Sequence, residues 1–411
     1  MLLRTKSLAG EEYGWEVDGF GPKAARWALA ISVSAMRSVG IGMLGAGFIG
    51  QMHSLAFGAV KYAKPQHRIE SRLLSLADID RPLVDEVQRR YGWEYATTDW
   101  RETVDNPNVE LFINSGPNDV HADPTIAAAG KGKHIFSEKP LARTAAEAFL
   151  IWQTVETAQV RHMCGFIHRF IPALQLARRM IAGGEIGRVR HFRSNFLIDM
   201  QHPGSTLSWR YSTRAAGGGA TADLGSHHID QARFLVGEVQ RVSGMLGSWS
   251  KDAAGRVSDV NDDWFAAAAE FENGATGVFE GSRVSEGHPL TGRIEVDGTL
   301  GTILWEMSRV SELQITEPRK GRRTLTVVLP DHPYSDFWLP VGIQGSFAIG
   351  WRDCFFHQAQ HMLAAVAFGE SIEPIGATLK DGYRVAEIVE AVQRSARNGS
   401  VEAIEFREAA Q

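Results

Sequence analysis

The sequence has 411 residues, of which 44% are hydrophobic and 22% charged, with a formal net charge of −5 and a mean hydropathy of −0.17. This composition is typical of a globular protein, and the length favours two domains. The small negative charge offers no basic surface for nucleic acid, and no run of 18 apolar residues predicts a membrane span. The two cysteines, Cys164 and Cys354, form no CxxC or zinc-type spacing, so a reducing cytoplasm fits best.

The first 35 residues are predicted to be a poorly ordered extension. Met36 directly precedes a segment that is typical of the start of a folded domain. Residues 26–36 (RWALAISVSAM) also have the apolar character of a signal-peptide core. That apolar stretch is short, however, and the segment after it is itself typical of a buried strand. We therefore prefer the extension.

Residues 39–44 are short and apolar, as expected of a strand buried on both faces of a parallel sheet. They lead into the turn GAGFIG, which a helical pattern follows. Gly45 permits the tight turn, Gly47 lets a pyrophosphate approach the backbone, and Gly50 allows close packing of helix on strand. The helix N-terminus then offers N–H groups to the phosphates. The predicted dinucleotide contacts here are Gly45, Gly47, Phe48, Ile49 and Gly50.

The second predicted strand, residues 73–78, ends in Asp78. A carboxylate at this place accepts hydrogen bonds from a ribose 2′-hydroxyl and repels a 2′-phosphate. Asp78 lies further from the glycine turn than the usual ~20 residues, and the extra length falls in residues 58–72. The sequence therefore predicts NAD as the cofactor rather than NADP.

Strands and helices continue to alternate up to a sixth strand near Cys164, which predicts a doubly wound parallel sheet. Ligands of such sheets bind beyond the carboxyl ends of the strands. We therefore expect Asn118, His121, Glu138 and Lys139 to line a cofactor crevice. Pro140 keeps Lys139 out of helical geometry. The Lys139 amine could hydrogen-bond a substrate hydroxyl, or accept a proton if its pKa is lowered.

The second half begins with a helix closed by glycines and an alternating strand, followed by GGGATADLGSHHID at residues 217–230. Several strands with glycine turns and two helices complete the chain. This order predicts an α+β domain built on one open, mostly antiparallel sheet. Helices would cover one face, and the apolar positions of the other predict a subunit interface. The expected division is an extension at 1–35, a nucleotide-binding domain at 36–165, and a substrate-binding and oligomerisation domain at 166–411.

Residues 222–230 (ADLGSHHID) place two histidines between two aspartates, and three interpretations compete. Asp223 and His227 could share a metal ion, but His228 would point roughly 100° away from His227 on a helix, and no third ligand has a telling spacing. The histidines could instead pack a core helix, which suits His228 better. As a proton relay, Asp223 and His227 would lie at i and i+4 on one helix face. Asp223 would then fix the imidazole tautomer and favour its protonated form, while His227 takes a hydroxyl proton.

The chain resembles the Gfo/Idh/MocA family of sugar and polyol dehydrogenases. The resemblance rests on the ordered motifs GAGFIG, GPNDVH, SEKP and GGGATADLGSHHID and on the helix LARRMIAGGEIGRV, and it covers the chain from Val39 nearly to the end. It implies a Rossmann domain joined to an open-sheet domain, often assembled as a tetramer or dimer through that sheet. It also implies oxidation or reduction of a secondary hydroxyl of a sugar or cyclic polyol with NAD(P).

The resemblance implies site residues as well. Lys139, Asp223 and His227 would form the catalytic group, and Asp230 would contact substrate hydroxyls; Arg210 is a further expected substrate contact. Residues 207–211 and 341–351 are most similar to the levoglucosan-dehydrogenase-like branch, which oxidises pyranosides at C3. The alternatives are an inositol or polyol dehydrogenase, a glycosidase that retains NAD and acts through a transient keto-sugar, and a non-catalytic NAD-binding regulator, which should lack the Lys/Asp/His set.

Overall fold

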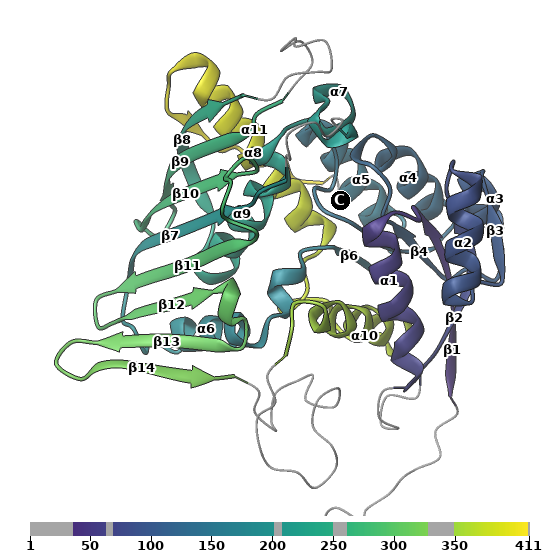
Figure 1. The fold of residues 1–411 in the computed structure, drawn as a ribbon, viewed down its shortest axis with the longest axis horizontal. Helices are drawn as coiled ribbons and strands as arrows, with labels where there is room; N and C mark the ends of the chain where they lie inside the picture. Colours follow the sequence, from purple (N-terminus) through teal and green to yellow (C-terminus); the bar gives the residue numbers. More distant parts are fainter. Residues whose placement is uncertain (1–35, 63–68, 201–207, 250–260, 328–348, 410–411) are drawn as a thin grey trace, which may run out of the picture. The chain divides into compact units, whose positions relative to one another are not determined.

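The computed structural model describes residues 36–62, 69–200, 208–249, 261–327 and 349–409. The predicted extension, residues 1–35, therefore lies outside the described residues. The chain from Arg37 to Gln411 falls in one compact unit that contains two β-sheets (Figure 1). A division of this unit at residues 165 and 166 stays a prediction. Within the described ranges, no helix combines the length and apolar character that crossing a membrane requires.

The first sheet has six parallel strands in the order β3-β2-β1-β4-β5-β6, so the predicted doubly wound sheet is confirmed. The chain returns from β3 to pair β4 with β1, and this reversal of strand order opens a crevice at the strands' carboxyl ends. The strands are β1 (Arg37–Leu44), β2 (Ile69–Ala77), β3 (Tyr95–Thr97), β4 (Leu111–Asn114), β5 (His134–Ser137) and β6 (His162–Cys164). The helices that connect them are α1 (Phe48–Ala59), α2 (Arg81–Tyr91), α3 (Trp100–Asp105), α4 (Ala122–Gly130) and α5 (Ala145–Thr157).

The second sheet has nine strands in the order β14-β13-β12-β11-β7-β10-β9-β8-β15. Among the described strands of this second sheet, only β7 and β10 pair in parallel, and every other pair is antiparallel. The expected mostly antiparallel sheet is therefore confirmed. The strands are β7 (Val189–Leu197), β8 (Val239–Gly247), β9 (Trp264–Phe271), β10 (Thr276–Ser282), β11 (Thr291–Gly298), β12 (Thr302–Glu306), β13 (Glu312–Glu317), β14 (Gly321–Thr326) and β15 (Glu402–Ala403).

Helices cover one face of the large sheet, the face that looks toward the parallel sheet (Figure 1). Burial alternates along β9 and β11, as expected of strands with one covered face. On the opposite face, the described residues form no helix. The helices of this half are α6 (Pro172–Ala182), α7 (Thr213–Ala216), α8 (Ala220–Asp223), α9 (Gly225–Leu235), α10 (Asp353–Phe368) and α11 (Leu379–Asn398).

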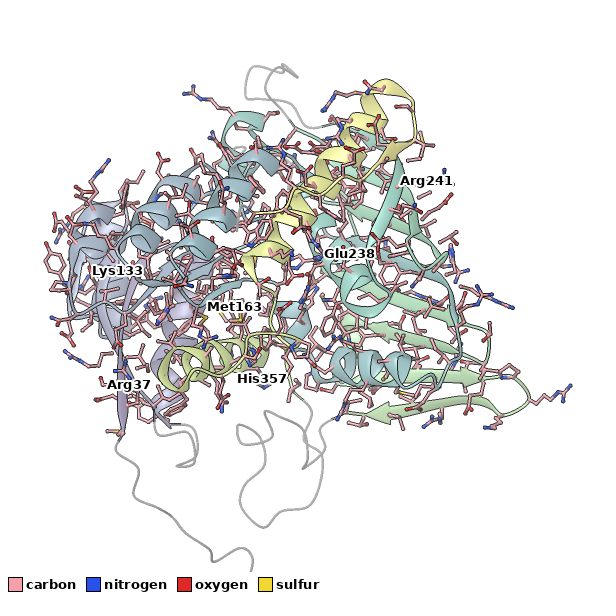
Figure 2. All side chains as sticks on the ribbon, turned by 180° about the vertical axis from the view of Figure 1, so that it is seen from behind. Arg37, Lys133, Met163, Glu238, Arg241 and His357 are labelled. Atoms are coloured by element: carbon pink, nitrogen blue, oxygen red, sulfur yellow. The ribbon has the colours of Figure 1, made fainter. Side chains whose placement is uncertain are left out.

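The last two helices tie the halves together. Helix α10 contacts α1, and α11 contacts α5. Met163 on β6 and His357 on α10 are both fully buried, and Figure 2 shows them from behind. Cys164 also forms a backbone bridge with Ala377, just before α11. Helix α9, which carries the two histidines, thus lies between the two sheets, at the carboxyl ends of the parallel strands.

Candidate active site

A cavity of about 840 Å³ lies at the carboxyl ends of the parallel strands. The glycine turn after β1 and the residues after β2, β4 and β5 line one side of it. The other side is lined by Trp351 and Phe355 and by six residues of the second half: Trp209, Arg210, Ala216, Gly218, Asp223 and His227. The predicted site residues among the lining are Gly45, Gly47, Phe48, Ile49, Asp78, Asn118, Glu138, Lys139, Arg210, Asp223 and His227.

The glycine turn has the geometry that a pyrophosphate requires. Gly45 has a φ of +101°, in the left-handed region that favours glycine. A Cβ atom on Gly50 would lie 2.0 Å from the Gly45 carbonyl oxygen, so the close approach of turn and helix needs a glycine there. A Cβ on Gly47 would meet no atom within 4 Å, and Gly47 begins α1 without a side-chain cap. The first N–H groups of α1 are therefore available to an anion.

Asp78, at the end of β2, is held by the backbone of this turn. Its Oδ2 accepts a hydrogen bond of 2.7 Å from Ala46 N, and its Oδ1 accepts one of 3.0 Å from Asp80 N. Asp80 also lines the cavity, whereas the cation of Arg81 is held by Asp85. Two carboxylates on this wall suit a ribose diol and oppose a 2′-phosphate. When NAD is bound, the turn and Asp78 are the groups that would hold its pyrophosphate and adenosine ribose.

His121 lies behind the predicted crevice, and its contact with a cofactor stays a prediction. It is buried, does not line the cavity, and its ring nitrogens lie 2.9 Å from the Gly116 carbonyl oxygen and 3.2 Å from that of Leu141. The ring therefore braces two loops. Asn118 does line the cavity, and its side-chain amide donates a hydrogen bond of 2.8 Å to the Ala216 carbonyl, which connects the two halves.

Lys139 and Asp223 meet across the cavity. The Lys139 Nζ donates to Asp223 Oδ1 over 2.8 Å and to the Asp223 carbonyl over 3.2 Å. Burial alone would raise the pKa of Asp223, but Lys139 and Arg210 outweigh burial and hold it below its ordinary value. Beside Lys139, the Glu138 carboxylate accepts the Lys139 backbone N–H over 3.0 Å and contacts His53 Nε2 over 2.7 Å. This wall of the cavity is therefore a series of connected polar and ionisable groups.

His227 lies beside this pair, but not in the way the sequence suggested. The expected continuous helix is interrupted at Leu224, because α8 ends at Asp223 and α9 begins at Gly225. Among the described residues, the side-chain partner of the Asp223 carboxylate is Lys139, not His227. Burial, with a smaller effect of the Lys139 cation, holds the pKa of His227 well below its ordinary value. Burial therefore favours the neutral imidazole of His227, and the proton relay of Asp223 and His227 stays a prediction.

Most of the residues that line this site fall within two matched family models. Residues 39–166 match an oxidoreductase family with an NAD-binding Rossmann fold, and residues 174–304 match the GFO/IDH/MocA C-terminal domain. The chain belongs to the Gfo/Idh/MocA oxidoreductase family. It is an NAD-dependent oxidoreductase, as the sequence predicted.

Individual relatives of this Gfo/Idh/MocA protein extend over nearly its whole length. Levoglucosan dehydrogenase of Pseudarthrobacter phenanthrenivorans is 36% identical over an alignment of 390 positions, which covers 89% of this chain and 98% of that protein. Inositol 2-dehydrogenase of Rhizobium meliloti is 27% identical, covering 87% of this chain and 97% of that protein. A solved structure of levoglucosan dehydrogenase with NADH and levoglucosan has a TM-score of 0.84 and 35% identity, covering 90% of this chain and all of that one.

Asp230, the expected substrate contact of this family member, lies outside the cavity. Its carboxylate is wholly buried and accepts three hydrogen bonds of 2.6–3.1 Å from the Arg169 guanidinium. A carboxylate saturated by a buried arginine has little capacity left for a substrate hydroxyl. In the structure Asp230 thus has an internal partner, and its contact with a substrate stays a prediction. Arg210, by contrast, does line the cavity, with its guanidinium 4.5 Å from the ring of Trp209.

His228 packs as the structural interpretation expects. The edge of its buried ring meets Phe196, with centroids 5.6 Å apart and planes at 89°, and burial lowers its pKa to about 3. Within the ranges that the structure describes, no three His, Cys, Asp or Glu side chains are grouped as a metal site would require.

The residues that hold the glycine loop of the second half are not predicted from the sequence. Asp262 accepts the Gly219 and Thr221 backbone N–H groups over 2.8 and 2.7 Å, and Asn261 donates to the carbonyls of Gly218 and Arg210 over 3.0 and 2.9 Å. The adjacent polar residues before strand β9 were the available signal. Trp351 ends the segment 341–351 that resembles the levoglucosan-dehydrogenase-like branch, but the sequence predicts neither Trp351 nor Phe355 as part of a cavity wall.

Proposed function

We propose that this chain oxidises a secondary hydroxyl of a sugar, glycoside or anhydrosugar, at C3 of a pyranoside, to a ketone. The observation that carries this proposal is the grouping of Lys139, Asp223 and His227 on one cavity with the dinucleotide turn. The related levoglucosan dehydrogenase, and its solved complex with NADH and levoglucosan, support a sugar as the substrate.

The residues divide the chemistry of an alcohol oxidation between them. Bound NAD supplies the acceptor for the hydride that leaves the carbon. Lys139 donates a hydrogen bond to the substrate hydroxyl and stabilises negative charge on its oxygen. His227, neutral in the cavity, accepts the hydroxyl proton, so that the C–O bond becomes a carbonyl. Asp223 accepts a hydrogen bond from the Lys139 amine and so directs it.

The relation to inositol 2-dehydrogenase supports a second candidate, oxidation of an inositol or another cyclic polyol. The same three residues would serve, because an inositol also presents secondary ring hydroxyls. The substrate panel below discriminates between the two candidates.

The purified chain would be mixed with NAD and with single members of a panel that includes levoglucosan, pyranosides, aryl glycosides and inositols, while absorbance of NADH is followed. We expect one NADH per ketone formed, fastest with a pyranose or anhydrosugar. Fastest turnover of an inositol would support the second candidate. Release of an aglycone without net NADH would identify the glycosidase alternative, and no turnover of any member would contradict the proposal.

We also propose that the helix-free face of the large sheet binds a second copy of this chain in a dimer or tetramer. A groove of about 670 Å³ on this face is lined by the exposed Met245 and Val278 together with Trp264. Arg193 and Glu295 beside them form an ion pair, so both signs of charge are present for pairing with an identical face. Light scattering after size exclusion should give a dimer or tetramer that Val278→Asp dissociates; a monomeric wild type would contradict this.

A further inference from the structure

Aromatic rings enclose His227 where the sequence led us to expect a carboxylate. The ring of His168 stacks on that of His227, with centroids 4.4 Å apart and planes 24° apart. Phe196 and Phe166 approach the same ring, with centroids at 6.0 and 6.4 Å. The Nδ1 of His227 is fully buried and has no hydrogen-bond partner among the described residues. The nitrogen left to meet a substrate in the cavity is therefore Nε2.

A buried ion pair holds the two histidines against each other. Arg169 directly follows His168 in the short helix η4 (Ile167–Phe170), and Asp230 lies one turn after His227 on α9. The guanidinium and the carboxylate are 2.6 Å apart at their nearest atoms, with side chains 6% and 0% exposed. Because this pair connects η4 to α9 right beside the rings, the stacking of His168 on His227 is fixed by the fold.

The charged groups around the stack leave His168 neutral. Burial, and then Lys139, lower the pKa of His168 to about 3. Lys139 is the cation that faces both rings, and its own partner is Asp223. His228, on the same helix as His227, is also neutral, because burial lowers its pKa to about 3.

The other elements packed against the stack contribute aromatic rings. Strand β7 supplies Phe196, and strand β12 supplies Trp305, whose ring centroid lies 6.3 Å from that of His168. His168 therefore presents an uncharged aromatic face to His227 over the pH range in which the enzyme would work.

We propose that His168 is a positioning residue: its ring holds His227 with Nε2 toward the cavity and stabilises the charge that His227 gains from the substrate proton. The proposal rests on the proposed function, in which the hydroxyl proton passes to His227 and the hydride to NAD. A cation next to an aromatic face is attracted by the negative charge of that face, and this attraction is stronger where water is excluded. This face replaces the aspartate that supports histidine bases elsewhere.

The kinetic test compares three substitutions in the full-length protein: His168→Leu, His168→Phe and, as a matched control, His228→Leu. His228 is equally buried and adjacent to His227 but does not stack on it. We expect His168→Leu to lower kcat about tenfold, with KM and the Kd of NAD within about twofold. His168→Phe should keep kcat within about threefold of wild type, and His228→Leu within about twofold. If the leucine variant does not fold, His168→Gln, which also lacks a ring, should show the same loss.

Wild-type kcat in His168→Leu would overturn the proposal, and so would a loss in His168→Phe as large as that in His168→Leu.

A second measurement needs no turnover. NMR of the ¹⁵N-histidine-labelled protein with NAD would follow the His227 ring during an acid titration. We expect a lower midpoint in His168→Leu than in wild type and His168→Phe; an unchanged or raised midpoint overturns the proposal. This result stands even if no sugar of the panel is oxidised, in which case only the proposed function fails.

Discussion

The two walls of the cavity are built by different means. The cofactor wall is mainly backbone: a glycine turn, the N-terminus of α1 and the ends of parallel strands. The substrate wall is mainly side chains held by buried partners, such as Lys139 with Asp223 and the glycine loop with Asp262. Backbone geometry follows from local sequence, whereas buried pairs join residues far apart in the chain. Substitutions in the cofactor wall should therefore change the affinity for NAD, whereas substitutions in the substrate wall should change turnover.

The largest effect should come from Lys139→Met, which keeps the length of the side chain and removes its charge. The substrate oxygen then loses its hydrogen-bond donor, and Asp223 loses the cation that lowers its pKa. We expect kcat to fall by roughly 10³-fold. Titration with NAD, followed by protein fluorescence, should give a Kd within a few-fold of wild type. A weakened NAD affinity with intact kcat would show that Lys139 belongs to the cofactor wall instead.

Asp230→Ala should lower the free energy of unfolding and leave the cofactor affinity of the other wall unchanged. The substitution leaves the Arg169 guanidinium buried beside fewer acceptors, and breaking a buried ion pair in this way costs about 3 kcal/mol. Urea unfolding would measure this loss. Asp381 also contacts Arg169, 3.3 Å away, and limits the loss. If Asp230→Ala were fully stable and only KM for the substrate rose, the sequence-based role of Asp230 as a substrate contact would be correct after all.

Gly50→Ala tests the cofactor wall by itself. The added Cβ would lie 2.0 Å from the Gly45 carbonyl oxygen, so the turn must move away from α1. We expect the Kd of NAD to rise at least about 100-fold, because the backbone N–H groups lose their common direction. Gly130→Ala is the matched control, since a Cβ on Gly130 meets no atom within 4 Å. Equal NAD affinity in both variants would contradict the backbone account of this wall.

The same contrast explains how far the sequence could predict the structure. The glycine turn, the parallel sheet and the cofactor rest on signals within a few residues of each other, and the structure and the family confirm them. The internal partner of Asp230 could not be predicted from local patterns, because Arg169 lies 61 residues away in the chain. The rule that ligands meet residues after strand ends was applied to β4 and β5. Applied to β6 as well, it would have pointed to the region of His168.

The smallest effect concerns the buried histidines and the pH dependence of stability. The pKa of His228 is about 3 in the folded protein because of burial, against about 6.5 in the unfolded chain. Between these values the unfolded state binds a proton that the folded state does not. The free energy of unfolding therefore falls as the pH drops below about 6.5, by about 1 kcal/mol per pH unit for this group.

His228→Leu should flatten that dependence without reducing stability at neutral pH. Leucine removes the titrating group, and it also removes two ring nitrogens that are buried without hydrogen-bond partners among the described residues. Urea unfolding at pH 7 and pH 5 would give the difference, which should be about 2 kcal/mol smaller in the variant than in wild type. His168, also with a pKa of about 3, continues to titrate in the variant, so part of the acid sensitivity remains. An unchanged dependence would mean that His228 is protonated in the folded state, and the charge next to His227 would then oppose the proton transfer that the substrate wall is proposed to perform.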